Sequence, residues 1–173
     1  MSKVESMVSI LLCVGSLLFS SALFGQQSGC NEPEFRAFDF WLGTWEVSDN
    51  LTGNLAGRNT ITQMEGGCML LESWQGAAGS TGTSVNYYNP VLQQWRQLWI
   101  SAGRYSIDIS GDLSDGSMQL VGHIYPFAGA AARFRGTWTP NPDGSVRQFF
   151  EQYNEATENW DVWFDGRYVL SEN

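Results

Sequence analysis

Histidine and lysine are almost absent from this chain: His123 is the only histidine and Lys3 the only lysine. A single histidine excludes a zinc or iron site built from several histidines. Because Lys3 lies in a segment that we expect to be removed, a Schiff base on a lysine is excluded in the mature chain. The chain also lacks a Gly-x-Ser-x-Gly elbow, a His-Glu-x-x-His motif and a phosphate-binding loop. We therefore expect neither a metal nor a cofactor.

Basic side chains are few: nine Lys and Arg stand against 18 Asp and Glu, and the net charge is -9. With a pI near 4.4 and no basic cluster, the sequence argues against nucleic acid or an anionic membrane as partner. The simplest interpretation of the charge is solubility outside the cell.

Only one long apolar run exists, from Met7 to Phe24. Lys3 precedes it and small residues end it, which is typical of a secretory signal peptide over residues 1–25. Cleavage could follow Ala22 or Gly25. An uncleaved membrane anchor is the alternative, but serines break the run, and it is short for a span of about 20 residues. We expect an exported protein, periplasmic or extracellular, with no stable membrane anchor after processing.

Two cysteines remain once Cys13 leaves with the signal peptide. An even pair in an exported protein favours a disulfide between Cys30 and Cys68, which could stabilise the fold by ~2–4 kcal/mol. A reactive thiol or a metal ligand is the alternative. Ser28-Gly29-Cys30 also resembles the end of a lipoprotein cleavage box, although Gln27 stands where leucine is expected, so lipidation of Cys30 stays open.

Residues 26–173 fit one domain that can bury a sizeable core. Turn signals such as Asn89-Pro90 and Ser114-Asp115-Gly116 recur at short intervals, and the segments between them are rich in β-branched and aromatic residues. We predict an all-β, antiparallel up-and-down barrel with a short helical plug near 34–42; a sandwich is the alternative. The predicted strands lie near 44–49, 56–65, 68–75, 82–88, 95–101, 104–111, 117–125, 131–139, 145–153 and 160–169.

Strict alternation sorts three of these strands into two faces. Trp95, Gln97, Trp99 and Ser101 share one face of their strand. In the strand near 145–153, residues 146, 148, 150 and 152 share one face. In the last strand, Trp160, Val162 and Phe164 share one face, and Asp161 and Trp163 share the other. Aromatic rings and amides on the same face indicate the lining of a small-molecule cavity. An outer face of the barrel is the alternative, because aromatic residues occur on both faces.

The stretch Phe38-Asp39-Phe40-Trp41-Leu42-Gly43-Thr44-Trp45 resembles the opening of calycin barrels, which include lipocalins, fatty-acid-binding proteins and nitrobindins. Together with other segments, it is similar to a family of secreted bacterial lipocalin-like proteins that has no settled activity. The other segments are Gly67-Cys68, Glu72-Ser73-Trp74, 79–84, Asn86-Tyr87-Tyr88, 95–99, 143–148 and 164–168.

The resemblance implies that Trp45 seals one end of the barrel beneath Arg167 from the last strand, through a cation–π contact worth ~0.5–2 kcal/mol. Nitrobindins resemble this chain only over Leu42–Trp45, and they bind haem through a histidine late in the chain. Because His123 lies in mid-chain, the haem site does not carry over.

The candidate ligand-binding residues are polar or aromatic side chains on matching segments: Glu72, Asn86, Gln97, Trp99 and Gln148. An inward Glu72 needs partners, and Asn86, Gln97, Gln148 or Arg147 could meet it across adjacent strands. Such contacts would either orient a ligand or only fix strand register.

The sequence therefore predicts an exported barrel that binds a small apolar or amphipathic molecule as a carrier or sensor. One alternative is a cofactor-free isomerase or cyclase that uses Glu72 or His123 as acid–base. Another is a purely structural or partner-binding domain.

Overall fold

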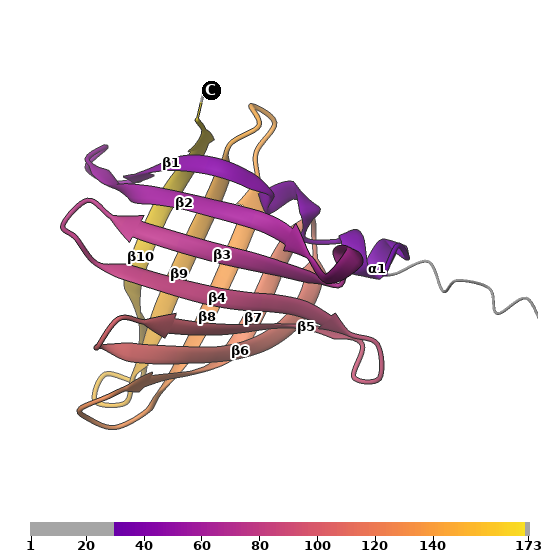
Figure 1. Cartoon of the computed structure of the whole chain (residues 1–173). Coiled ribbons are helices and arrows are strands. Elements are labelled where there is room, and N and C mark those ends of the chain that lie inside the picture. Colours follow the sequence, from indigo (N-terminus) through magenta and orange to yellow (C-terminus); the bar gives the residue numbers. More distant parts are fainter. Residues whose placement is uncertain (1–29, 172–173) are drawn as a thin grey trace, which may run out of the picture.

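The described residues, 30–171, of the computed structural model form ten strands in one closed antiparallel barrel (Figure 1). The barrel prediction is therefore confirmed, while the predicted signal peptide lies outside the described residues. The strands are β1 (Gly43–Asp49), β2 (Leu55–Met64), β3 (Met69–Gly76), β4 (Thr81–Asn89), β5 (Gln94–Ser101), β6 (Tyr105–Ser114), β7 (Ser117–Pro126), β8 (Ala132–Pro140), β9 (Val146–Asn154) and β10 (Asn159–Leu170).

Each strand pairs with its neighbours in sequence, and β1 pairs with β10 to close the sheet. At this seam Trp45 lies opposite Leu170 and Asp49 opposite Gly166. Short turns suffice for such a meander, and closure leaves no edge among the ten described strands open to pairing with another chain. The sandwich alternative is excluded by this topology.

Two short helices, α1 (Pro33–Arg36) and η1 (Asp39–Trp41), form the predicted plug at one end of the barrel (Figure 1). Phe38 and Trp41 are fully buried and stack with ring centroids 5.0 Å apart. Phe38 also meets Trp138 edge-on at 5.2 Å. Aromatic pairs in these geometries stabilise a core beyond the area they bury. No helix within residues 30–171 is long and apolar enough to cross a membrane.

A disulfide joins Cys30 to Cys68, as predicted. Cys30 precedes the plug, and Cys68 follows η2 (Glu65–Gly67), the turn between β2 and β3. In the same region Arg36 donates a hydrogen bond to the carbonyl of Gly67. The plug is thereby tied covalently to the rim that it covers.

Trp45 does lie buried at the plugged end, but the prediction that it contacts Arg167 is wrong. The Trp45 indole donates to the carbonyl of Trp41 at 2.9 Å. On β10, Arg167 stands between the inward residues Gly166 and Tyr168, so alternation turns it outward, where it pairs with Asp143 at 2.7 Å. The plug, rather than an arginine, covers this end.

A β-bulge in β10 changes the faces predicted for this strand. The register with β9 shifts between Val162 and Phe164, so Trp163 is an extra residue without a direct partner. Trp160 and Val162 therefore lie on the outer side, whereas Phe164 packs inward. Such an insertion re-aims the side chains that follow it. The other two alternations, on β5 and β9, place the expected residues inside.

Candidate functional site

The inward side chains of three strands change in the same order from the plugged end to the open end of the barrel. β3, β5 and β9 each present an apolar residue first, then a buried polar one, then a large aromatic one. Because every second residue of a strand points inward, the three strands build three layers. The apolar layer contains Leu70, Trp95 and Val146, the polar layer Glu72, Gln97 and Gln148, and the aromatic layer Trp74, Trp99 and Phe150.

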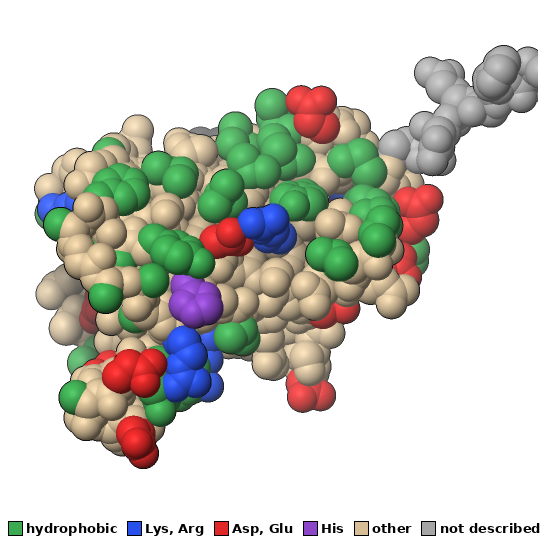
Figure 2. All heavy atoms as spheres, turned by 90° about the horizontal axis from the view of Figure 1, so that it is seen from below, with side chains coloured by type: hydrophobic (Ala, Val, Ile, Leu, Met, Phe, Trp, Pro, Cys, Tyr) green, Lys and Arg blue, Asp and Glu red, His purple; other side chains and the backbone are tan. Residues whose placement is uncertain are grey.

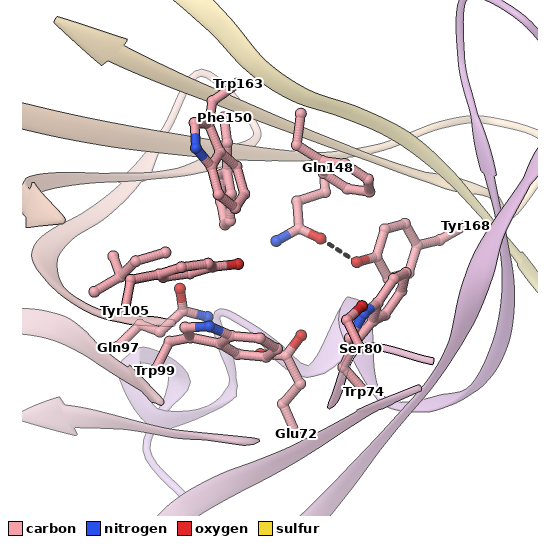
Figure 3. A pocket seen from close by; sticks show the side chains of 12 residues that line it. Glu72, Trp74, Ser80, Gln97, Trp99, Tyr105, Gln148, Phe150, Trp163 and Tyr168 are labelled. Carbon is pink, nitrogen blue, oxygen red and sulfur yellow. Dashed lines mark hydrogen bonds between the residues drawn. The ribbon is translucent and has the colours of Figure 1, made fainter. Parts of the chain in front are cut away.

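A cavity of about 200 Å³ lies between the polar layer and the open end (Figure 3). The cavity reaches the open end of the barrel, where it is lined by Ser80 of the β3–β4 turn and by Trp163, which is 39% exposed. Four of the five predicted binding residues line it, whereas Asn86 does not. The lining consists of Glu72, Trp74, Ser80, Gln97, Trp99, Tyr105, Ile107, Gln148, Phe150, Trp163, Phe164 and Tyr168.

Glu72 lies at the inner end of this cavity and is only 3% exposed. Its Oε1 accepts a hydrogen bond from the Asn59 amide at 2.7 Å, and its Oε2 accepts one from the Ser84 hydroxyl at 2.5 Å. Burial raises the pKa of Glu72 to about 7, although both hydrogen bonds act in the opposite direction. The carboxyl group can therefore exchange a proton near neutral pH.

A chain of amide and hydroxyl groups on β4 and β5 ends at this carboxylate. The Gln97 amide donates to Asn86 Oδ1 at 3.0 Å, the Asn86 amide donates to Ser84 Oγ at 2.8 Å, and Ser84 donates to Glu72. Every donor points toward Glu72, so the arrangement favours its ionised form. Ser84 and Asn59 had not been identified from the sequence as its partners. The suggested partner Arg147 lies outside the barrel, paired with Asp165.

Gln148 occupies the opposite wall of the cavity. Its Oε1 accepts a hydrogen bond from the hydroxyl of Tyr168, which itself accepts one from Asn59 at 3.3 Å. Burial and the charge of Glu72 hold the pKa of Tyr168 well above its ordinary value, so Tyr168 stays neutral. The Gln148 amide nitrogen points into the open centre of the cavity (Figure 3). It is a hydrogen-bond donor available to a ligand.

Aromatic rings form the remaining walls. Tyr105 and Trp163 meet edge-on at 5.3 Å near the open end, and Trp74 meets Phe164 at 6.3 Å. The sequence did not identify Tyr105 as a lining residue. It placed Trp163 on the wrong face of its strand, because simple alternation does not reveal a bulge. Burial also raises the pKa of Tyr105, so its hydroxyl enters the cavity in the neutral form.

Glycines on neighbouring strands leave room for these rings. A Cβ at Gly82 of β4 would lie 2.2 Å from the Trp99 ring, and a Cβ at Gly57 of β2 would lie 2.7 Å from Trp74. Phe150 lies over Gly136 of the neighbouring β8 in the same way, and Phe164 lies over Gly166 of its own strand. Each ring can therefore lie close to the barrel wall, which keeps the centre open.

Among the described residues, no lysine, arginine or histidine lines the cavity. His123 is exposed on the outer side of β7, opposite Arg133 of β8 (Figure 2). It therefore lies on the other side of the sheet from Glu72 and cannot act with it. Residues 30–171 contain no group of three or more His, Cys, Asp or Glu side chains suited to a metal ion.

The closed ten-stranded barrel is consistent with a calycin-like fold. No protein-family model matches the chain, and a search of curated proteins finds no match either. The interpretation of the site therefore depends on its own geometry.

Proposed function

We propose that this protein binds a small, partly apolar molecule inside its barrel, as a carrier or sensor. The observation that supports this most directly is the cavity between Glu72 and the open end, which has a polar floor and aromatic walls. Pockets of this composition bury the apolar part of a ligand and orient it through a few polar groups. The Gln148 amide and the Tyr105 hydroxyl are two such groups.

The volume of the cavity limits the ligand. A cavity of about 150 Å³ can hold one benzene ring, whereas drug-sized pockets occupy ~300–1,000 Å³. At about 200 Å³, this cavity suits a molecule of one or two rings or a short branched chain. Retinoids and long-chain fatty acids exceed this size.

We infer further that the chain is exported to the periplasm or beyond and is related to the secreted lipocalin-like proteins that it resembles. The Cys30–Cys68 disulfide supports export, because such bonds persist in oxidising compartments. Matching segments spread from residue 38 to residue 168 support the relationship.

Native mass spectrometry of the protein purified from its source tests binding directly. We expect a co-purified molecule of low mass, and tryptophan emission that shifts when this molecule is removed and returned. Gln148→Leu should weaken rebinding by ~1–3 kcal/mol through loss of a buried hydrogen bond. Gln119→Leu, at an exposed position of β7, is the control. A protein that never carries or binds a small molecule would leave the structural or partner-binding interpretation.

A cofactor-free enzyme is the second candidate, because burial brings the pKa of Glu72 to about 7, where a general base works best. An isomerase or cyclase of this kind would rely on Glu72 alone, since His123 faces outward. Conversion of the co-purified molecule by the wild type but not by Glu72→Gln would favour this candidate over a carrier.

A further inference from the structure

We propose that the ligand is a small organic cation, an aryl- or alkylammonium whose charge lies between the Glu72 carboxylate and the aromatic walls of the barrel. The proposal depends on the binding function described above and specifies the chemical class of the ligand.

The Glu72 carboxylate is buried without a cationic partner from the described residues. Glu72 is nearly inaccessible to solvent, yet no cationic side chain in the described part of the chain reaches the cavity. Both of its oxygens accept hydrogen bonds from neutral donors, Asn59 and Ser84. Such hydrogen bonds favour ionisation but supply no opposite charge, so the buried anion lacks a counter-ion. A cationic ligand would supply it.

The aromatic walls of the cavity also suit a cation. Three tryptophans, Trp74, Trp99 and Trp163, line one cavity with Tyr105. Aromatic faces attract cations, and rings grouped around one space are the usual means of binding ammonium groups. The same rings would accommodate the apolar part of the ligand, so both halves of an arylammonium find complementary surfaces.

The charge of the whole protein also favours a cationic ligand. The net charge is -9, and arginines such as Arg96, Arg135 and Arg147 form ion pairs with carboxylates on the outer face. The charges of these outer arginines are thus compensated by neighbouring carboxylates, whereas the charge of the Glu72 carboxylate has no such partner among the described residues. A cavity with low-dielectric walls and one negative group concentrates cations.

Phenyltrimethylammonium and its neutral isostere tert-butylbenzene form a matched pair of probes. They have the same shape and differ in charge, and the cation does not titrate. We expect the wild type to bind the cation roughly tenfold or more tightly than the isostere, measured by calorimetry and tryptophan emission. Glu72→Gln should remove this preference while keeping the side-chain shape. Glu46→Gln, which removes an equal charge from the outer face of β1, should preserve it.

A pH series on the wild-type protein provides a test that needs no variant. The titratable groups that face Glu72 are Tyr105 and Tyr168, and burial raises the pKa of both, so they stay neutral. Protonation of Glu72 should therefore weaken binding of the permanent cation roughly tenfold between about pH 8 and about pH 5.5. Binding of tert-butylbenzene should change little over this range.

The outcomes separate this proposal from the one it depends on. Equal or tighter binding of the isostere, or a co-purified ligand that is neutral or anionic, would overturn the proposal of a cationic ligand and leave the binding function intact. If neither probe binds and the purified protein carries no small molecule, the cationic ligand and the binding function are both overturned. If Glu72→Gln does not fold, as judged by near-UV circular dichroism, the pH series on the wild type decides.

Discussion

Ser84 and Glu72 lie directly opposite each other on β4 and β3, and the Ser84 hydroxyl donates to Glu72 Oε2 at 2.5 Å. Cross-strand partners of this kind are set by register, so the pairing of β3 with β4 also places a donor beside the buried acid. A shift by one residue would turn Glu72 to the outside. The polar layer thus depends on the register of β3 and β4.

The contribution of Glu72 to stability should fall as the pH rises from about 4.5 to about 7. The pKa of Glu72 is raised from 4.5 to about 7, so the stability linked to its neutral form is complete below about pH 4.5 and is lost as the pH rises to about 7. The loss is on the order of 3 kcal/mol. Denaturant titrations of the wild type and Glu72→Gln across this window measure it. The variant should not show this loss of stability. An identical decline in both proteins would assign the loss to other titratable groups.

Removal of the disulfide should cost ~2–4 kcal/mol, because the bond closes a loop between residues 38 positions apart and restrains the unfolded chain. The double variant Cys30→Ser/Cys68→Ser can be compared with the wild type by urea unfolding. The reduced wild type is its control and should match it. An exported protein with two free thiols, detected by intact mass, would contradict the predicted bond.

Gly82→Ala should reduce ligand binding more than its size suggests. The added Cβ would lie 2.2 Å from the Trp99 ring, so the ring must move into the cavity. Overpacking of this kind costs ~1–3 kcal/mol in stability. Unfolding and probe titration should both respond, whereas Thr83→Ala, an exposed neighbour on β4, should change neither. Unaltered probe affinity in Gly82→Ala would show that Trp99 does not shape the bound state.

Arg167→Ala should change stability by only ~0–1 kcal/mol, because its ion pair with Asp143 is exposed. Trp138→Ala, in contrast, removes a fully buried ring from the plugged end and should cost ~3–5 kcal/mol. Thermal unfolding of both variants tests the finding that the plug, and not Arg167, seals the barrel. A large loss in Arg167→Ala would argue for the arginine seal.

Trp163→Ala should weaken probe binding with little loss of stability. The ring lines the open end of the cavity but is 39% exposed, so its removal leaves no closed void. Calorimetric titration with phenyltrimethylammonium measures the first effect and thermal unfolding the second. Val162→Ala, the exposed neighbour on the same strand, is the matched control. A severe loss of stability in Trp163→Ala would make the residue part of the core.

The sequence by itself predicted the strands, the closed meander and the disulfide, because these follow from local signals: turn residues, alternation with a period of two, and an even pair of cysteines. It left a sandwich and a free or lipidated Cys30 as alternatives. It also predicted that Glu72, Asn86, Gln97 and Gln148 face inward, since each lies on a strand otherwise rich in large apolar residues. Only the tertiary structure decided what those residues meet. Asn59 reaches Glu72 through the β2–β3 register, and Trp163 enters the cavity through a bulge that strict alternation does not predict. The direction of the hydrogen bonds toward Glu72, the absence of a cation beside it within residues 30–171 and the space left above the glycines depend on distances between strands. Those distances are set when the whole sheet closes, and for that reason no single segment contains them.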